Sequence, residues 1–415
     1  MNAVKFKNFY VRSSLFTILS LTTAVFSYIL YPILVRVLSP VEFGDFAVVI
    51  AILNQILAVL VAINVISIYL VKTYGEQQAR DRAQIIQKAL IWFFVALSLV
   101  VLIVSPFLNK LFKIEDIGLF IVMTIILFAT LPLVVWTGYL QGHKELVRIG
   151  VSSVIGAFSK LVFAVILAIF FGPIGALVGV LLGSIVSIVA VGSYPGVRLP
   201  NLSSVFKKGN KDELKFLSTI RLYMIEAVFV VGALGLLQNY DITLAKALFG
   251  PSVAGIYSGV SILSNSLYYL AFILVWIVLP EIKIGDNKVN RRVLGTAYKL
   301  IGALTVFVIS VELVFKDSLT SLLLGHGFAD QGNLLIFATL YQLSLVSIVL
   351  YAFYLLVCRK NRGVLLVGLV FAFCMSLPIL FGKTPILMIQ TLWLSLVASV
   401  VVYFILLRTY YFIKK

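Results

Sequence analysis

The sequence predicts an all-α polytopic membrane protein. Its 415 residues are 62% hydrophobic and 12% charged, and its mean hydropathy of +1.12 exceeds that of ordinary soluble domains. The apolar residues form about twelve stretches, each long enough to cross a hydrocarbon core of about 30 Å as a helix. These stretches are continuously apolar, whereas an outer-membrane barrel would show short alternating segments. The bilayer is therefore the solvent of this chain.

The expected membrane-spanning helices follow one another with little chain between them. Their boundaries are set where the apolar run meets charged residues, Pro or Gly. In chain order we expect them at about residues 13–38, 43–71, 89–109, 117–140, 147–171, 174–194, 219–248, 253–280, 293–315, 333–357, 363–382 and 385–408.

Basic residues predict the orientation of the helices. Lys and Arg are concentrated in segments 5–12, 72–88, 198–221, 283–292 and 359–362, which all fall on one side of the predicted topology. Cytoplasmic loops retain basic residues during insertion, so both termini are expected in the cytoplasm. This sorting explains most of the net charge of +17, and no nucleic-acid partner is needed to account for it.

The chain divides into two predicted halves. The segment 196–217 is rich in Lys, Asn and Ser and reads as a cytoplasmic linker between six-helix bundles at residues 1–195 and 218–415. A repeat supports this division, because the basic, Pro, Gly and aromatic residues of segment 36–46 recur in segment 246–257 with one insertion. Six helices separate the copies, which predicts parallel halves related by a pseudo-two-fold axis along the membrane normal.

Small and turn-forming residues in these segments favour an architectural role. Pro40 and Pro251 are expected to start the second and eighth helices. A glycine face on the sixth predicted helix would allow a neighbouring helix to pack closely. This face consists of Gly172, Gly175, Gly179 and Gly183.

Lys160 is the main candidate for function inside the membrane. It lies about 13 residues, or about 20 Å, into the fifth predicted helix. A charge at that depth is costly, so it needs a partner, a water-filled cavity or a function. Lys160 could neutralise an anionic group in a central cavity, or it could pair structurally with Asp241 or Glu226 of the seventh helix.

Asp241 lies in a polar interruption of the seventh predicted helix. The run Gln238-Asn239-Tyr240-Asp241 follows Gly232 and Gly235, so this helix is expected to bend. A buried carboxylate there could bind a proton or Na⁺ and couple transport to an ion gradient.

The remaining polar candidates have two readings each. The repeat aligns Asn54 with Asn265, and both amides could bind a polar substrate or form hydrogen bonds between helices. Arg36, Lys246 and Glu312 lie near expected helix ends, where snorkelling to the interface is the simpler account. Asp45 follows just beyond the first helix.

Enzymatic and nucleotide-driven functions find no support in the motifs. The sequence has no G-x-x-x-x-G-K-[ST] loop and no H-E-x-x-H motif, and its two cysteines have no metal-ligand spacing. We therefore expect no cofactor, no metal and no catalysis, with H⁺ or Na⁺ coupling as the candidate energy source.

Four segments resemble the Wzx-type oligosaccharide flippases of the multidrug, oligosaccharidyl-lipid and polysaccharide export superfamily. They match the family's turn after the first helix, its counterpart after the seventh, the end of its fourth helix and its fifth-to-sixth hairpin, and the similarity extends over nearly the whole chain. The segments are VRVLSPVEFGDFAVVIAIL, QNYDITLAKALFGPSVAGIYSGVSIL, WTGYLQGHKE and FGPIGALVGVLLG.

The resemblance implies a twelve-helix, MATE-like fold with alternating access. It further implies transfer of an undecaprenyl-diphosphate-linked oligosaccharide, such as an O-antigen, capsule or exopolysaccharide repeat unit, from the cytoplasmic to the outer leaflet. Under this resemblance Lys160 would neutralise the diphosphate, and Asn54 and Asn265 could bind sugar hydroxyls. Arg36 and Asp45 fit the family pattern, and a monomer is expected. Membrane lipid, a polysaccharide polymerase and glycosyltransferases are the partners that such a function implies.

Departures from the family keep other functions open. Related lipid II flippases tend to carry an Arg-Asp pair in the first helix, where this chain has Ser27-Tyr28 and Tyr31-Pro32. An ion-coupled multidrug exporter of the same superfamily is one alternative, although it would favour acidic cavity residues over Lys160. A membrane polysaccharide polymerase or ligase is another, although the predicted external loops are short. A scaffold that organises glycosyltransferases is the third.

Overall fold

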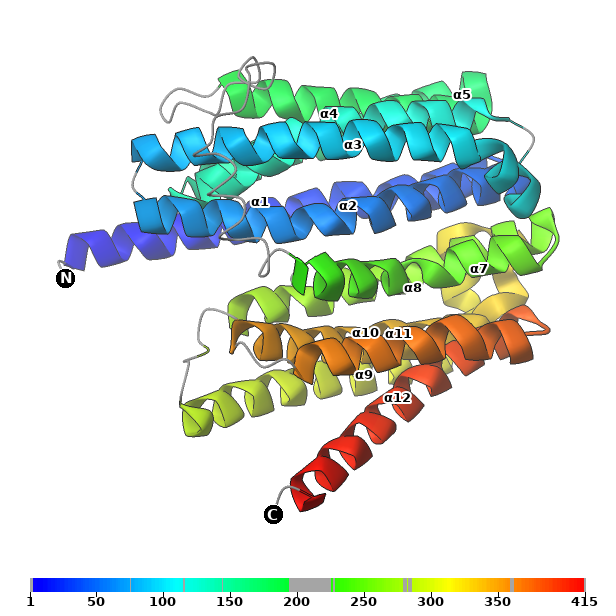
Figure 1. The fold of residues 1–415 in the computed structure, drawn as a ribbon. Coiled ribbons are helices and arrows are strands. Elements are labelled where there is room, and N and C mark those ends of the chain that lie inside the picture. Colours follow the sequence, from blue (N-terminus) through cyan, green and yellow to red (C-terminus); the bar gives the residue numbers. More distant parts are fainter. Residues whose placement is uncertain are drawn as a thin grey trace. The chain divides into compact units, whose positions relative to one another are not determined.

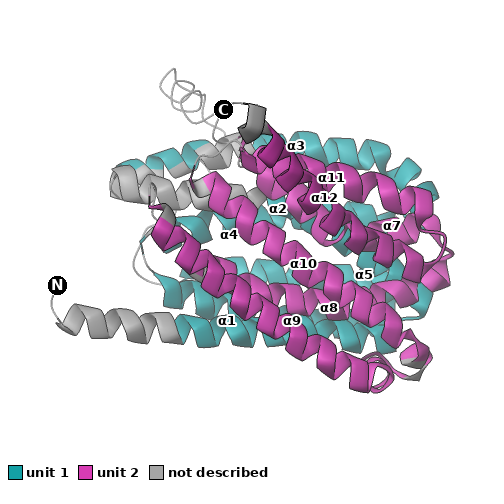
Figure 2. Cartoon of the chain, turned by 90° about the horizontal axis from the view of Figure 1, so that it is seen from below, with its two compact units in different colours: residues 1–224 teal, residues 225–415 magenta. Residues whose placement is uncertain are grey.

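The protein is helical throughout the part of the chain that its computed structural model describes. That part comprises residues 3–74, 76–114, 116–143, 145–193, 225–226, 228–278, 282, 286–358 and 362–413. The chain forms two compact units, Met1–Met224 and Ile225–Lys415 (Figure 2). The predicted linker, residues 196–217, lies outside the described residues.

Unit 1 contains five labelled helices, which run nearly side by side (Figure 1). They are α1 (Ala3–Val37), α2 (Pro40–Tyr74), α3 (Glu76–Phe112), α4 (Gly118–Gly142) and α5 (Leu146–Ser193).

Unit 2 contains the remaining helices. They are the helix Val228–Gln238, α7 (Tyr240–Leu248), α8 (Pro251–Val278), α9 (Asn287–Leu324), the 3₁₀ helix η3 (His326–Gln331), α10 (Gly332–Val357), α11 (Arg362–Phe381) and α12 (Pro385–Ile413).

The number of spans agrees with the sequence prediction. Among the described residues, ten helices are long and apolar enough to cross a membrane. The number rises to eleven if the bent pair Val228–Gln238 and Tyr240–Leu248 is counted as one span. One of the ten, α5, has a non-helical glycine, Gly172, with a segment of spanning length on each side. Counting those segments separately gives the twelve predicted spans.

Three helices are longer than predicted. Helix α1 begins at Ala3 rather than near residue 13. Helix α3 begins at Glu76 rather than near residue 89, and α9 runs from Asn287 to Leu324 rather than from about 293 to 315. Hydropathy detects only the apolar part of a helix, whereas backbone hydrogen bonding continues into the polar flanks. Asp286 extends α9 at its start, because its side chain accepts hydrogen bonds from the backbone of Lys288 at 3.1 Å and of Val289 at 3.0 Å.

The prolines of the repeated segments do start helices. Helix α2 begins at Pro40 and α8 begins at Pro251. The first turn of α2 also carries a capping box. Ser39 donates its backbone N–H to Glu42 Oε2 at 2.9 Å, and Glu42 donates its own to Ser39 Oγ at 3.3 Å.

Corresponding helices of the two units have the same packing partners, in agreement with the sequence repeat. In unit 1, α2 packs on α3 and α4, and α3 packs on α4. In unit 2, α8 packs on α9 and α10, and α9 packs on α10. Helix α10 is the centre of unit 2, since it also contacts α11 and α12. The C-terminal end of α12 diverges from α11 (Figure 1).

The predicted glycine face is where α5 folds back on itself. Gly172 has a φ of 58°, a left-handed conformation that favours glycine, and it breaks the helix. Beyond the break, Gly179 lies against the backbone of Ala164, and a Cβ on Gly183 would lie 2.7 Å from the backbone nitrogen of Lys160. The two arms of α5 therefore form a hairpin with backbone approaches that only glycine permits.

Arg148 fastens the other end of this hairpin. Its buried guanidinium donates to the carbonyl oxygen of Val191, from Nε at 3.0 Å and from Nη2 at 2.5 Å. Val191 lies in the last turn of α5, where carbonyl groups lack partners within the helix. Arg148 therefore links the start of α5 to its last turn by hydrogen bonds.

Candidate functional site

The seventh predicted span is broken at Asn239. The helix Val228–Gln238 ends there, α7 starts at Tyr240, and their axes differ by 52°. Asn239 has a φ of −119° and a ψ of 14°, which lies outside the helical range. The bend expected from the polar run and the preceding glycines is therefore confirmed.

Helix α10 supplies donors to the carbonyl groups that the break leaves without helical partners. Tyr341 donates its hydroxyl to the Leu237 carbonyl oxygen at 2.6 Å, and Gln342 donates from Nε2 to the Gln238 carbonyl oxygen at 3.1 Å. Backbone groups at membrane depth must be satisfied within the protein, so a break needs such a neighbour. These bonds hold the bent pair against the centre of unit 2.

Asp241 is fully buried in the first turn of α7. Its Oδ2 accepts a hydrogen bond from the Tyr257 hydroxyl at 3.0 Å and another from the Ser261 hydroxyl. Tyr257 and Ser261 are four residues apart and therefore share one face of α8. The helix N-terminus adds a favourable field for the carboxylate. Asp241 Oδ1 is buried and has no hydrogen-bond partner in the described part of the chain.

Several buried amide atoms near the break also lack hydrogen-bond partners among the described residues. These atoms are Gln238 Nε2, Asn239 Nδ2, Asn265 Oδ1 and Gln342 Oε1. Asn265 follows Ser261 by one turn on α8, so its side chain continues the polar face that holds Asp241. We call Gln238, Asn239, Asp241, Tyr257, Ser261, Asn265, Tyr341 and Gln342 the polar cluster of unit 2.

The polar cluster offers a carboxylate, hydroxyls and amides within a membrane-spanning unit. Oxygen atoms of these types suit a proton or a hard cation, and amides also suit sugar hydroxyls. The described residues contain no group of three or more His, Cys, Asp or Glu side chains that could hold a metal ion.

Sequence reasoning missed four members of the polar cluster, namely Tyr257, Ser261, Tyr341 and Gln342. Spacing could have found the first two, because Tyr257, Ser261 and Asn265 recur every four residues and so share one face of the helix. Tyr341 and Gln342 act on backbone atoms about 100 residues earlier in the chain, which no local pattern indicates.

The expectation of snorkelling is wrong for two of its three residues. Lys246 is only 1% exposed in the last turn of α7, and Glu312 is 4% exposed within α9. Both side chains are covered by neighbouring helices and not extended toward an interface. Arg36, in the last turn of α1, is exposed and fits the expectation.

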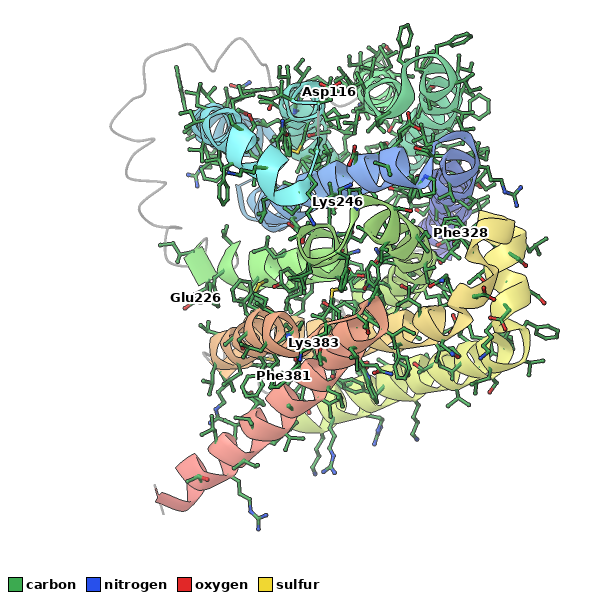
Figure 3. The ribbon with its side chains drawn as sticks, turned by 90° about the vertical axis from the view of Figure 1, so that its right-hand side faces the viewer. Asp116, Glu226, Lys246, Phe328, Phe381 and Lys383 are labelled. Carbon is green, nitrogen blue, oxygen red and sulfur yellow. The ribbon has the colours of Figure 1, made fainter. Side chains whose placement is uncertain are left out.

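The other predicted site residues are distributed between the two units. Lys160 on α5, Asn54 and Asp45 on α2 are half-buried in unit 1. Glu226 is half-buried in unit 2. It lies just before the bent pair of helices, and Lys246 lies at the far end of that pair (Figure 3). An ion pair of Lys160 with Asp241 or Glu226 stays a prediction, as do the substrate contacts of Lys160, Asn54 and Asn265.

Comparison with known families and structures finds similarity over most of the chain. A family model described as polysaccharide biosynthesis protein matches residues 11–283. Comparison with curated protein sequences finds no significant match.

Solved structures similar to the chain include two transporters and a flippase. An inward-facing multidrug resistance MATE family transporter of the MOP superfamily has a TM-score of 0.69 at 13% identity, covering 95% of this chain and 96% of its own. The lipid II flippase MurJ in an inward closed conformation has a TM-score of 0.69 at 14% identity, covering 95% and 87%. The eukaryotic MATE transporter AtDTX14 has a TM-score of 0.58 at 14% identity, covering 97% and 96%. The chain therefore has the MATE-like fold that its sequence predicted.

Proposed function

This chain belongs to the polysaccharide biosynthesis protein family, and from that premise we propose that it is a flippase for a lipid-linked oligosaccharide. The proposed substrate is an undecaprenyl-diphosphate-linked repeat unit of an O-antigen, capsule or exopolysaccharide. It would move from the cytoplasmic to the outer leaflet of a bacterial inner membrane by alternating access. The observation that carries the proposal is the family match over more than half of the chain, on a fold shared with a lipid II flippase.

Lys160 is the residue to which we assign the diphosphate. It is the only Lys, Arg, Asp or Glu between Arg148 and Arg198, in an otherwise apolar pair of spans. An ammonium at membrane depth would supply a compact counter-charge for a mobile anionic group. Asn54 and Asn265 would bind sugar hydroxyls, and Arg36, Asp45, Lys246 and Glu226 are further positions to test by substitution.

Asp241 is the group through which an ion gradient would drive transport. Its buried carboxylate and the surrounding oxygens provide a place for a proton or Na⁺ beside a broken helix. Ion occupancy there would change the charge next to the bend, and so favour one arrangement of the bent pair over another.

The alternatives are less well supported. A multidrug exporter would share the fold, but the family match favours a precursor of polysaccharide synthesis. A polymerase or ligase would need an extended catalytic segment on the outer side. The connections that the predicted topology puts on that side are short, as at residues 38–39, 249–250 and 382–384. Polymerases and glycosyltransferases are better candidates for partners of this protein.

The proposal is tested by transfer of an undecaprenyl-diphosphate-linked oligosaccharide across proteoliposome membranes. A membrane-impermeant sugar-modifying enzyme outside the vesicles reports how much substrate reaches the outer leaflet. We expect transfer that depends on the protein and is absent from protein-free vesicles. A protein that moves no lipid-linked sugar under either gradient, yet exports fluorescent cationic drugs, would establish the exporter alternative.

A further inference from the structure

Glu312 is a second buried carboxylate of unit 2, outside the polar cluster. It lies on α9, twelve residues or about 18 Å before the helix ends at Leu324. The residues that follow it, Leu313, Val314 and Phe315, are 61%, 72% and 54% exposed and form an apolar outer surface. Glu312 itself is only 4% exposed, so its side chain is directed inward, toward the packed side of α9.

The two carboxyl oxygens of Glu312 have different surroundings. Oε1 accepts a hydrogen bond from the Thr339 hydroxyl of α10 at 2.7 Å. Oε2 is buried and has no hydrogen-bond partner in the described part of the chain. An ionised carboxylate would therefore carry its charge with one hydroxyl donor only, whereas Asp241 has two hydroxyl donors and a helix N-terminus.

The nearest basic residue along α9 is engaged elsewhere. Lys316, one turn beyond Glu312, donates from Nζ to Asn333 Oδ1 at 2.7 Å. Helix α9 packs on α8, α10 and η3, and α8 and α10 contain no Asp, Glu, Lys or Arg. The titratable groups on those three elements and on the same turns of α9 are Tyr257, Tyr268, Tyr269, Tyr341, Tyr351, Tyr354, His326, Asp330 and Asp317.

We propose that Glu312 is a proton-binding site at the contact between α9 and α10. The carboxyl group is protonated while the two helices are packed as in this structure, because the neutral acid tolerates an apolar contact that the anion does not. It releases the proton when the contact opens to water. The site is distinct from Asp241, whose two hydroxyl donors favour an ionised carboxylate more than the single donor of Glu312 does.

Dicyclohexylcarbodiimide tests the proposal, since this apolar reagent reacts with protonated carboxyl groups in apolar surroundings. The full-length protein in liposomes is treated at about pH 7, where an ordinary Glu with a pKa of about 4.3 is ionised, and adducts are mapped by peptide mass spectrometry. We expect Glu312 to be modified more than Asp241 and more than the exposed Asp317 of the same helix. Modification of Glu312 no greater than that of Asp317 would overturn the proposal.

Two variants separate a proton site from a structural hydrogen bond. Thr339→Val removes the single donor while keeping the side-chain shape, so modification of Glu312 should persist to higher pH than in the wild type. Glu312→Gln mimics the neutral acid, so its unfolding temperature should equal that of the wild type at neutral pH. A large loss of thermal stability in Glu312→Gln, with no effect of Thr339→Val on modification, would show that Glu312 is ionised in the folded protein. That result would contradict the proposal. These readouts need no transport assay, so a failure of the proposed flippase function would leave them interpretable.

Discussion

The hydroxyl of Tyr257 donates a hydrogen bond to Oδ2 of Asp241 across the contact between α8 and α7, with the two oxygens 3.0 Å apart. The bond joins α7, which follows the break in the seventh span, to Tyr257 of α8, the last residue of the repeated segment 246–257. The carboxylate is thereby held in one orientation, with its other oxygen buried and without a hydrogen-bond partner in the described residues. The predictions below begin from this arrangement.

Asp241→Asn should remove the dependence of transport on an ion gradient while preserving the fold. The amide keeps the size of the side chain but lacks the negative charge that a bound cation requires. The measurement is the transfer rate in proteoliposomes with and without a Na⁺ or proton gradient. Asp317→Asn, a change at an exposed acid on α9, serves as the control. Gradient-dependent transfer by Asp241→Asn would exclude Asp241 as the coupling group.

Tyr341→Phe should destabilise the bent helix pair, because the Leu237 carbonyl would lose its donor from α10. Hydrogen bonds between membrane helices contribute about 0.6 kcal/mol on average and at most about 1.7 kcal/mol, so a loss in that range is expected. Thermal unfolding in detergent measures it. Ser376→Ala is a suitable control, since that hydroxyl bonds only within its own helix. An unchanged unfolding temperature would mean that the bend does not depend on this contact.

Lys160→Ala should lower substrate transfer without loss of folded protein. Alanine retains the Cβ that packs near Gly183, so the hairpin of α5 keeps its contact while the ammonium is removed. The same transfer assay measures the effect, and Lys299→Ala, at an exposed lysine of α9, controls for loss of charge alone. Wild-type transfer by Lys160→Ala would rule out the diphosphate-binding role.

Gly183→Ala should destabilise the protein by about 1–3 kcal/mol, the usual cost of overpacking. The added Cβ would lie 2.6 Å from Lys160 Cα and 2.7 Å from its nitrogen, and these backbone atoms cannot move aside. Gly302→Ala in α9 meets nothing within 4 Å, so it should be neutral or stabilising by up to about 1 kcal/mol. The two unfolding temperatures are compared in one detergent, and equal values would contradict the hairpin packing.

Cysteine labelling should place the predicted linker and the end of α9 on opposite sides of the membrane. In a background without Cys358 and Cys374, Gly209→Cys should react only with a reagent that reaches the cytoplasm. Ser318→Cys, at an exposed position near the end of α9, should react with an impermeant external reagent. Labelling of both cysteines from the same side would contradict the expected topology.

Local patterns were sufficient for the helices and for several turns. The apolar runs predicted twelve spans, the prolines of the repeat marked the starts of α2 and α8, and the polar run around Asn239 predicted a bend. Each of these features depends on residues within about one helix length. The glycine face of α5 was also readable, because residues four apart on a helix share a face.

The burial of charged side chains could not be predicted from such local patterns. Lys246 and Glu312 were expected to reach an interface, because hydropathy places them near the ends of apolar runs. Their burial depends on how far each helix extends and on which face meets a neighbour. Helix α9 continues to Leu324, and Glu312 is covered by its contact with Thr339 of α10.

The sequence by itself determined the membrane fold, the family, the repeat and the position of the bend, because apolar length and local turn chemistry act on neighbouring residues. Only the tertiary structure decided that Asp241 meets Tyr257 and Ser261, that α10 supplies donors to the broken helix, and that Arg148 binds the Val191 carbonyl. These contacts depend on the rotation and depth of each helix relative to its neighbours. Inside a membrane, hydrophobicity is nearly uniform around a helix, so packing and hydrogen bonds set that rotation.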